Sequence, residues 1–448
     1  MSASAHNAGS AASLKRSLAS RHARERRFRR LGMLAVISAI VFVAVLFSSI
    51  LIKGAPAFEQ ATLSLHVTFD PAVIRIKPRP QRIAGQSPAD FARRKRSWQR
   101  SLALVDWNRV IETALRKTVG DADISSRDLV RLIASAERFR LRDMVAKDPA
   151  IIGATLPVNL LASADVDVWL KGNIDHSLPD NRQQLSVAQR RIVEDLSKRG
   201  ILHMAFAKAL FLNVDSRSSP ASAGLAGAFV GSLYMMLVVI ALAVPIGVAS
   251  AVYLEEFAPK NRVTDFVEVN INNLAAVPSI VFGLLGAAVF IGWFHLPLSA
   301  PLVGGLILSL MTLPVVIIAT RVTLRAIPAS IRHAALGLGA SPTQMVFHHV
   351  LPLAVPGILT ATIIGVAQAL GETAPLLLIG MNAFVAHIPQ TPLEQSTALP
   401  VQIFLWQGNE NRNFFESRTS AAIIVLIVLM IGLNGLAVFM RQKFERRW

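Results

Sequence analysis

Residues 31–52, LGMLAVISAIVFVAVLFSSILI, form a run of 22 residues without a single charged side chain. As an α-helix this run is about 33 Å long, which is enough to cross a hydrocarbon core of about 30 Å. It is also longer than the apolar segment of a cleaved signal peptide, which has about 7–15 residues. We therefore predict an uncleaved first transmembrane helix at residues 31–52.

Five further apolar stretches follow, and together with the first they make six predicted transmembrane helices. These five stretches lie near residues 225–254, 271–294, 302–320, 353–381 and 421–440. Only 17% of the 448 residues are charged, whereas soluble domains average about a quarter. The fold class that we predict is an all-α membrane protein.

Basic residues mark one side of the predicted membrane protein. The tails at residues 1–30 and 441–448 are rich in arginine, and the connection around residues 321–349 is also basic. The connection at residues 295–301, HLPLSAP, carries no lysine or arginine. Because basic segments are retained in the cytoplasm, we predict that both termini are cytoplasmic.

Residues 53–220 differ from the rest of the chain, because they are rich in charged residues. Apolar residues recur every three or four positions at 127–145, RDLVRLIASAERFRLRDMV, and at 185–210, LSVAQRRIVEDLSKRGILHMAFAKAL. This spacing is typical of amphipathic helices. We predict a mainly helical extracytoplasmic domain between the first and second spans, to which the sequence assigns no role. A domain that lies on the membrane surface is the alternative.

The net charge of +18 is compatible with nucleic acid, an anionic lipid surface or anionic cargo as a partner. The long apolar runs favour membrane lipid over nucleic acid. The chain has no cysteine, which excludes disulfides, thiolate metal sites and cysteine nucleophiles. The phosphate-binding pattern GxxxxGK[ST] is also absent from the sequence, so we expect any ATP to be bound by a separate subunit.

The connection at residues 331–352, IRHAALGLGASPTQMVFHHVLP, carries the most specific pattern in the chain. A short helix of small residues that ends at a glycine can enter a narrow cleft on a partner, and Pro342 suits the first turn of the next helix. The spacing of the motif resembles the EAA loop of the membrane subunits of binding-protein-dependent ABC importers. We predict that residues 328–352 dock an ATPase; an ordinary helix–turn–helix connection is the alternative. The residues that match the motif are Ala334, Ala335, Gly339, Leu351 and Pro352, and His333 stands where the glutamate of the motif is usual.

The stretch at residues 369–380, ALGETAPLLLIG, places a carboxylate and a proline inside an apolar segment. A charged side chain at mid-bilayer costs about 2.5–3.5 kcal/mol, so Glu372 is expected to face a partner, water or the bundle interior. The ring of Pro375 would clash with the carbonyl of Gly371, which predicts a break in the helix. The Thr373 hydroxyl is then placed to cap the second half-helix.

Two arginines, Arg321 and Arg325, lie at the inner end of the fourth predicted span. They are candidate partners for Glu372, or candidates for drawing an anion along a path between the helices. Extension of both side chains to the lipid headgroups is the alternative.

The stretch ALGETAPLLLIG, at this distance after the 328–352 loop, resembles the PstA-type permease subunits of phosphate-specific ABC importers. The resemblance implies a type I ABC importer permease fold over residues 225–440, in the inner membrane of a bacterium. It implies no enzymatic activity and no cofactor in this chain, and a path for inorganic phosphate shaped by Gly371, Glu372, Thr373 and Pro375, with Arg321 and Arg325 as further candidates. The implied partners are a second permease subunit in a heterodimer, an ATPase dimer that uses ATP and Mg, and an extracytoplasmic phosphate-binding protein.

Three alternative functions stay open at this point. The chain could be a permease for another oxyanion such as sulfate, molybdate or a phosphonate, because the 328–352 loop does not distinguish between these solutes. A membrane-anchored sensor would explain residues 53–220 but does not need six spans. A secondary transporter would leave the 328–352 loop unexplained.

Overall fold

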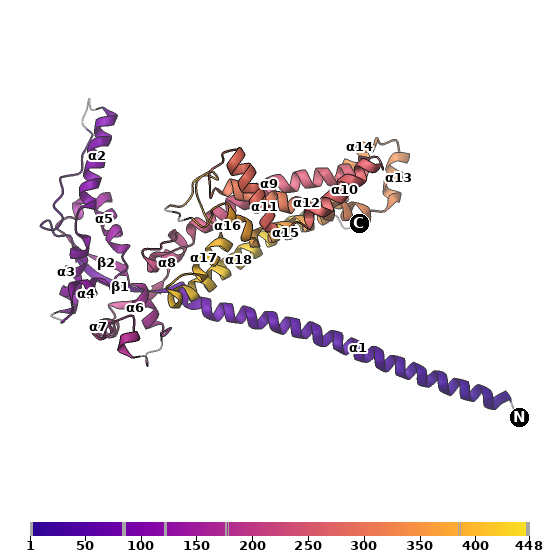
Figure 1. The fold of residues 1–448 in the computed structure, drawn as a ribbon, viewed down its shortest axis with the longest axis horizontal. Helices are drawn as coiled ribbons and strands as arrows, with labels where there is room; N and C mark the ends of the chain where they lie inside the picture. The colour runs from indigo at the N-terminus through magenta and orange to yellow at the C-terminus, as the bar shows by residue number, and fades with distance from the viewer. Residues whose placement is uncertain are drawn as a thin grey trace. The chain divides into compact units, whose positions relative to one another are not determined.

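The computed structural model describes residues 3–82, 87–120, 123–174, 177, 179–383, 385 and 387–444. These residues divide into two units, Met1–Lys53 and Gly54–Trp448. Helix α1, Ala3–Gly54, is continuous and provides the first unit (Figure 1). It contains the predicted first transmembrane helix at residues 31–52, and the segment Arg24–Phe58 is long and apolar enough to cross a membrane.

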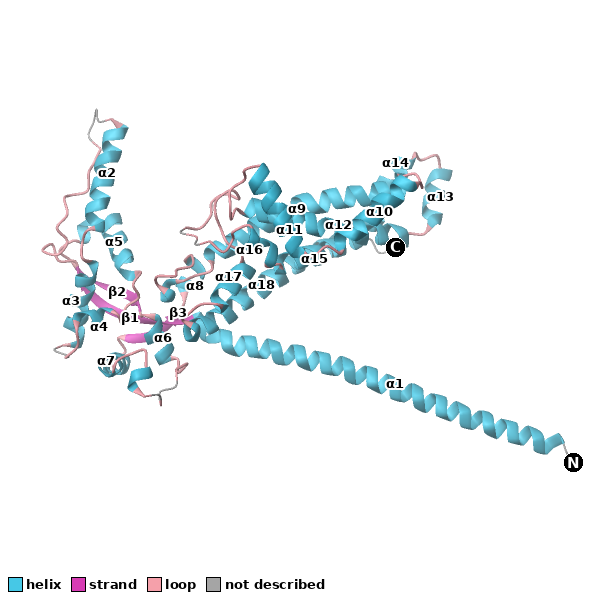
Figure 2. Cartoon of the chain, in the orientation of Figure 1, coloured by secondary structure: helices cyan, strands magenta, loops and turns pink. Residues whose placement is uncertain are grey.

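A three-stranded antiparallel sheet organises the first part of the second unit (Figure 2). Strand β1, Glu59–Thr68, lies between β2, Thr155–Leu161, and β3, Leu202–Phe206. Leu63 on β1 faces Leu160 on one side and Leu202 on the other. Leu63, Leu65 and Val67 are buried because alternate residues of a strand point to the same face of a sheet.

Short helices cover this sheet, and we call residues 59–206 the sheet domain. Its core includes Trp107, Leu115 and Leu141, which pack with the buried face of β1. The helices of the sheet domain are α2 Pro88–Ala103, α3 Trp107–Val119, α4 Ser126–Val130, α5 Glu137–Lys147, α6 Ala164–Leu170 and α7 Val187–Lys198, and α8, Lys208–Leu212, follows β3.

The prediction of a mainly helical domain holds, but the sheet was not predicted and both amphipathic runs are broken. The run at 127–145 divides into α4 and α5, and Ile133 between them bridges to Ala162 beside the sheet. In the run at 185–210 the first helix ends at Lys198, because Gly200 adopts a φ of 72° that a continuing helix does not allow, and a helix resumes only with α8 at Lys208. The residues between these two helices pair with β1 as β3.

The second part of the unit is a helical bundle that follows a 3₁₀ turn at Pro220–Ser222. Five helical segments of the described chain, including α1, are long and apolar enough to span a membrane. The bundle helices are α9 Ala226–Val252, α10 Arg262–Ala275, α11 Ser279–Gly286, α12 Pro301–Ala326, α13 Ala329–Gly337, α14 Pro342–Gln344, α15 Leu351–Gly371, α16 Ala374–Leu378, α17 Leu399–Gln407 and α18 Arg412–Phe444. Wider π-helical turns extend α9 through Phe257 and α11 through Trp293, and connect α14 to α15.

The predicted third span, residues 271–294, is not a straight helix. The segments Arg262–Ala275 and Ser279–Trp293 meet at an angle of 100°, so the six predicted spans are found only if this pair counts as one. Pro278 stands at the bend, where its ring disfavours a helical conformation for the preceding residue. The predicted fifth span, 353–381, also differs, because its long helix ends at Gly371.

Glycines allow the long helices of the bundle to approach each other closely. A Cβ atom on Gly305 of α12 would lie 2.5 Å from the Cβ atom of Val238 on α9. A Cβ atom on Gly357 of α15 would overlap the side chain of Thr323 on α12. Because lipid gives membrane helices little hydrophobic reason to associate, such close packing is a main source of their attraction.

A fully buried arginine joins the start of α18 to the segment that enters the bundle. Arg418 donates hydrogen bonds to the carbonyl oxygens of Ala221 and Ala223, and its guanidinium lies 4.6 Å from the ring centre of Phe414. Gln60 on β1 donates to the same Ala221 oxygen. The sheet domain and α18 are therefore held together by shared hydrogen bonds to one short piece of backbone.

Candidate functional site

Helix α13 and the turn after it form the candidate docking site that the sequence predicts. The N–H of Ala340 donates to Ala335 O at 3.1 Å and the N–H of Gly339 donates to Leu336 O at 3.0 Å. With Gly339 at a φ of 89°, these bonds make a Schellman end to the helix. The predicted helix of small residues that ends at a glycine is confirmed.

The next helix begins three residues later, as the sequence predicts. Ser341 caps it in a capping box with Gln344, with reciprocal hydrogen bonds of 3.0 and 3.3 Å. Pro342 occupies the first helical position, where its missing N–H leaves no hydrogen bond unmade. Leu351 and Pro352 lie at the start of α15, with Pro352 exposed.

The tip of α13 is not covered by any other described part of the chain. His333, Ala334, Gly337 and Gly339 are exposed, and Leu338 is 91% exposed although its side chain is apolar. A Cβ atom on Gly337 would meet no described atom within 4 Å. Of the predicted docking residues on α13 only Ala335 is buried, because it faces the core that contains Val346 and Val350. The tip therefore presents small and apolar groups at the surface.

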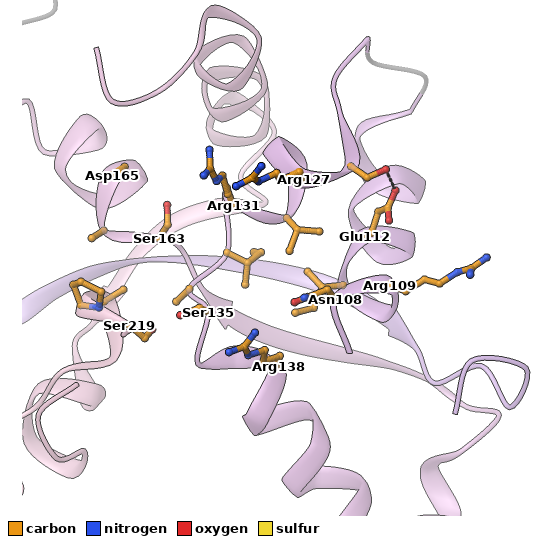
Figure 3. Close-up of a pocket in the computed structure, with 18 of the residues that line it drawn as sticks. Asn108, Arg109, Glu112, Arg127, Arg131, Ser135, Arg138, Ser163, Asp165 and Ser219 are labelled. Atoms are coloured by element: carbon orange, nitrogen blue, oxygen red, sulfur yellow. Dashed lines mark hydrogen bonds between the residues drawn. The ribbon is translucent and has the colours of Figure 1, made fainter. Parts of the chain in front are cut away.

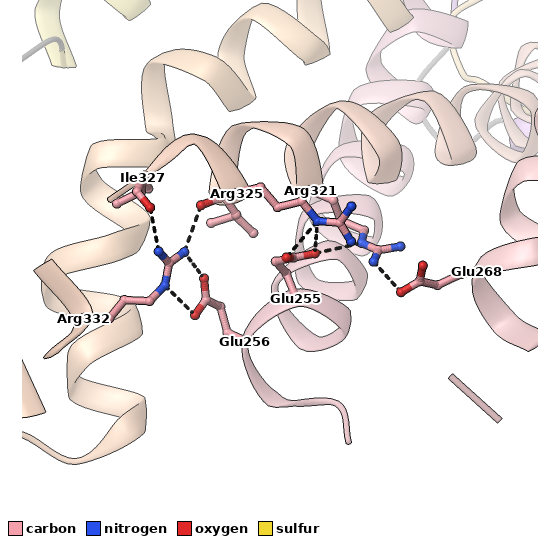
Figure 4. A network of polar contacts seen from close by, with 8 residues as sticks. Glu255, Glu256, Glu268, Arg321, Arg325, Ile327 and Arg332 are labelled. Carbon is pink, nitrogen blue, oxygen red and sulfur yellow. Dashed lines mark hydrogen bonds and ion pairs between the residues drawn. The ribbon is translucent and has the colours of Figure 1, made fainter. Parts of the chain in front are cut away.

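One arginine of α13 ties this helix to the two long helices beside it (Figure 4). Arg332 bonds the carboxylate of Glu256, just beyond α9, with distances of 2.6 and 3.2 Å. The same guanidinium donates at 2.8 Å to the carbonyl oxygens of Leu324 and Ile327, at the end of α12, where carbonyl groups lack the usual α-helical donors. The hydrogen bonds with Glu256 raise the pKa of Arg332. Arg332 therefore connects α13 directly to the ends of α9 and α12.

The prediction that Arg321 or Arg325 pairs with Glu372 is wrong. Both arginines bond Glu255, Arg321 at 3.2 Å and Arg325 at 2.9 Å, and Arg321 also pairs with Glu268 on α10 (Figure 4). These contacts lie beside α13, whereas Glu372 follows the far end of α15. A helix of 21 residues is about 31 Å long, so the two sites are too far apart for an ion pair.

Sequence reasoning missed the acidic half of this network. Glu255 and Glu256 directly follow the predicted second span, 225–254, and Glu268 precedes the predicted third span, 271–294. The available signal was the pair Glu255–Glu256 directly after an apolar run of about 30 residues. A carboxylate that is only partly exposed at the end of a membrane-spanning helix needs a cationic partner.

The break predicted at residues 371–375 is present. Helix α15 ends at Gly371, Glu372 has an extended backbone with a φ of −76° and a ψ of 130°, and α16 begins at Ala374. Pro375 is buried against α11, where a Cβ atom on Gly283 would lie 2.7 Å from the Cα atom of Pro375. The broken segment is therefore held against the second half of the bent pair.

Two details at this break differ from the sequence prediction. The Thr373 side chain makes no capping hydrogen bond to α16, although its carbonyl accepts the N–H groups of Leu376 and Leu377 at 3.1 Å. Glu372 is half-buried, and its side chain makes no hydrogen bond or ion pair within the described part of the chain. Gly371 beside it borders open space, because a Cβ atom there would meet nothing within 4 Å.

Comparison with known proteins defines the class of this chain. A family model described as "binding-protein-dependent transport system inner membrane component" matches residues 243–448, and a domain of unknown function, DUF3333, matches residues 15–180. The chain belongs to the family of ABC transporter permeases, in which it has a type I permease fold with an additional N-terminal region. It is an integral inner-membrane transport component rather than an enzyme, and proteins of this class associate with an ATPase and other transporter components.

Among individual relatives, the chain is similar to phosphate permeases. It is 34% identical to the phosphate transport system permease protein PstA of Mycobacterium leprae, over 50% of this chain and 72% of the relative. It is 32% identical to the probable ABC transporter permease protein YqgI of Bacillus subtilis, over 50% of this chain and 80% of the relative. A solved inward-facing structure of the MetNI methionine ABC transporter has 17% identity and a TM-score of 0.38, covering 49% of this chain and 95% of that chain.

Proposed function

We propose that this chain is the permease subunit of an ATP-driven importer that moves inorganic phosphate across the inner membrane. The observation that carries the proposal is the similarity to PstA permeases, which covers 72% of the Mycobacterium leprae protein. The exposed tip of α13 and the arginine network behind it support an ATP-driven mechanism, because they form a surface for a partner and a rigid connection to the bundle.

The orientation that we propose places α13 and both termini in the cytoplasm. The tails at residues 1–30 and 441–448 are basic, as is the connection that contains α13, and basic segments are retained on that side. The sheet domain then lies on the extracytoplasmic side of the membrane. In this orientation α13 is accessible to a cytoplasmic ATPase, and the sheet domain is on the side from which an imported solute arrives.

The proposed assembly contains four kinds of subunit. A second permease subunit completes the membrane passage as a heterodimer, an ATPase dimer docks at residues 328–352, and an extracytoplasmic binding protein delivers phosphate. ATP and Mg are bound by the ATPase subunits, since the present sequence has no GxxxxGK[ST] loop. Membrane lipid surrounds the assembly, and nucleic acid has no part in it.

Alternating access is the mechanism that these contacts support. Closure of the ATPase dimer around ATP would displace α13, and Arg332 would transmit that displacement to the ends of α9 and α12. The bundle would open outward to accept phosphate and return inward after hydrolysis. An unpaired phosphate dianion in hydrocarbon would cost tens of kcal/mol, so the path must be polar and closed to lipid.

The half-buried carboxylate of Glu372 supplies a specific prediction for this path. Replacement by glutamine keeps the size of the side chain but removes a negative charge beside the open space at Gly371. We expect Glu372→Gln to lower phosphate uptake or to uncouple it from ATP hydrolysis. Both rates are measured in proteoliposomes with the complete transporter, and unchanged values for both would show that Glu372 has only a structural role.

Phosphate uptake in living cells tests the proposed function itself. A strain that lacks its own high-affinity phosphate permease is complemented with this chain and its partner subunits, and uptake of radiolabelled phosphate is measured. We expect uptake only when the ATPase is present, and no inhibition by excess sulfate or molybdate. Full uptake without the ATPase would support a secondary transporter, and strong inhibition by another oxyanion would reassign the cargo.

A further inference from the structure

A cavity of about 630 Å³ lies between the sheet domain and the entry to the bundle (Figure 3). Its walls come from α3, α4, α5 and α6, from Ser219–Ala221, and from Asn411 just before α18. This volume is in the range of small-molecule sites, about 300–1,000 Å³, and is far larger than a single inorganic ion requires. Neither the proposed docking site nor the segment around Glu372 contributes to it.

The basic residues of the cavity are largely without partners. Arg127 forms no ion pair or side-chain hydrogen bond among the described residues, and Arg138 only stacks on Phe139, with 4.6 Å between the guanidinium carbon and the ring centre. Arg131, one helical turn after Arg127, is 3.7 Å from the nearest carboxylate oxygen, that of Asp128. Arg127, Arg131 and Arg138 are three of the four arginines that line the cavity, and their charges have little local neutralisation.

Two buried polar atoms in the cavity wall also have no hydrogen-bond partner. They are Nε of Arg138 and Oγ of Ser163, both of which are inaccessible to solvent in the described structure. A buried donor that makes no hydrogen bond costs about 1–3 kcal/mol, and such atoms are uncommon in folded proteins. Both residues line the cavity, so a ligand with acceptor oxygens would reach either atom only after a shift of its side chain.

The carboxylates of the cavity do not cancel these charges. Asp106 accepts the N–H of Arg109 at the start of α3, and Glu112 bonds Arg116 at 2.9 Å and also Ser126. Only Asp165 is without such a partner, and its burial raises its pKa, although Arg131 acts in the opposite direction. The available charge in the cavity is therefore positive.

From this geometry we propose that the cavity binds a small organic ligand through a phosphate group that Arg127, Arg131 and Arg138 contact. Arginine is suited to this role because its planar guanidinium forms paired hydrogen bonds with phosphate oxygens. The remaining volume takes the organic part of the ligand, which is either a soluble phosphate ester or the headgroup of an anionic phospholipid. The site is separate from the proposed transport path and does not depend on the cargo.

Occupancy of this cavity would also act on the bundle. Ala221 lines the cavity, and its carbonyl is held by Arg418 of α18 and by Gln60 of β1. A ligand in contact with Ser219–Ala221 therefore stabilises the connection between the sheet domain and α18. We expect a ligand-dependent increase in the melting temperature of the full chain.

The test uses the purified full chain in nanodiscs of phosphatidylcholine. In one arm, glycerol 3-phosphate is titrated and its Kd is measured by calorimetry; in the other, phosphatidylglycerol is added to the discs and retained lipid is counted by native mass spectrometry. We expect at least one probe to bind wild type, and Arg127→Gln with Arg138→Gln to weaken that binding at least tenfold. The matched control is Arg142→Gln, on the same helix α5 but outside the cavity and paired with Asp143 at 2.8 Å.

The two arms identify the source of the phosphate group and can overturn the proposal. Binding of glycerol 3-phosphate indicates a soluble ester, and selective retention of phosphatidylglycerol indicates a lipid. Any binding of a probe in the transport path is common to all variants, so only the difference between variants reports on the cavity. Equal binding by wild type and the double variant, or no binding of either probe, contradicts the proposal. If the variant with both Arg127→Gln and Arg138→Gln does not fold, the milder variant Ser163→Ala takes its place. We expect Ser163→Ala to weaken binding of the probe about threefold.

Discussion

Tryptophan at position 337 is expected to reduce phosphate uptake to below about a tenth of the wild-type rate. Gly337 is exposed on the last turn of α13, and a Cβ atom there would meet no described atom within 4 Å, so we expect the substitution to leave the fold of this subunit unchanged. In the complex the indole would occupy the space that the ATPase needs for close approach to α13. The effect arises from lost docking and not from unfolding.

The measurements separate docking from folding. Radiolabelled phosphate uptake reports on function, size-exclusion chromatography in detergent reports on insertion and folding, and co-purification of the ATPase reports on docking. Gly337→Ala is the control, because it makes the same backbone less flexible without adding bulk, and it should retain at least half of the uptake. Gly339 is less suitable for this test, since its φ of 89° makes any side chain strain the backbone. Normal uptake by the tryptophan variant would argue against docking at α13.

Reversal of the charge at Arg332 should cause a comparable loss of uptake through a different step. In Arg332→Glu, two carboxylates face each other, and Glu256, whose side chain is only 5% exposed, loses its cation. Loss of one partner of a buried pair costs about 3–5 kcal/mol. We expect the ATPase still to bind the exposed tip of α13 while phosphate uptake falls at least tenfold, because the connection to α9 and α12 is broken.

A double-mutant cycle tests this assignment. The variant with both Arg332→Glu and Glu256→Arg restores opposite charges and should recover part of the uptake, but not all, because a glutamate cannot donate to the Leu324 and Ile327 carbonyls. The matched control is Arg325→Gln, whose side chain is 58% exposed and whose partner Glu255 keeps Arg321. Exposed pairs contribute about 0–1 kcal/mol, so this control should change uptake less than twofold. Equal losses in the control and in Arg332→Glu would show that the contact with α13 has no special role.

Features set by neighbouring residues could be predicted from the sequence. The end of α13 at Gly339, the start of the next helix at Pro342 and the break before Pro375 all depend on which backbone angles a single residue allows. The apolar runs were similarly informative, since only a long helix satisfies its own backbone in lipid. The bend at Pro278 follows the same rule, although the apolar residues on both sides of it were predicted as one span at 271–294.

Features that join distant parts of the chain could not be predicted in this way. Arg332 pairs with a glutamate 76 positions earlier, and β1 pairs with strands that lie about 90 and 140 positions later. The candidate partners of Glu372 were chosen by charge alone, and the structure shows that those arginines already hold Glu255 and Glu268. The cavity at Arg127 and Arg138 was also not visible in the sequence, because its walls come from four helices and from connecting segments that lie far apart in the chain.

The sequence alone determined that the chain crosses a membrane, where its helices end at Gly339 and Gly371, and which segment presents small residues at the surface. These properties follow from local backbone preferences and from the free energy of transferring apolar residues to lipid. The tertiary structure alone decided which charges neutralise each other and which remain unpaired, because a pairing depends on the distance between groups after folding. Arg332 and Glu256 meet only when α9, α12 and α13 are packed together, whereas Arg127 and Arg138 remain without an anionic partner in the described part of the folded chain.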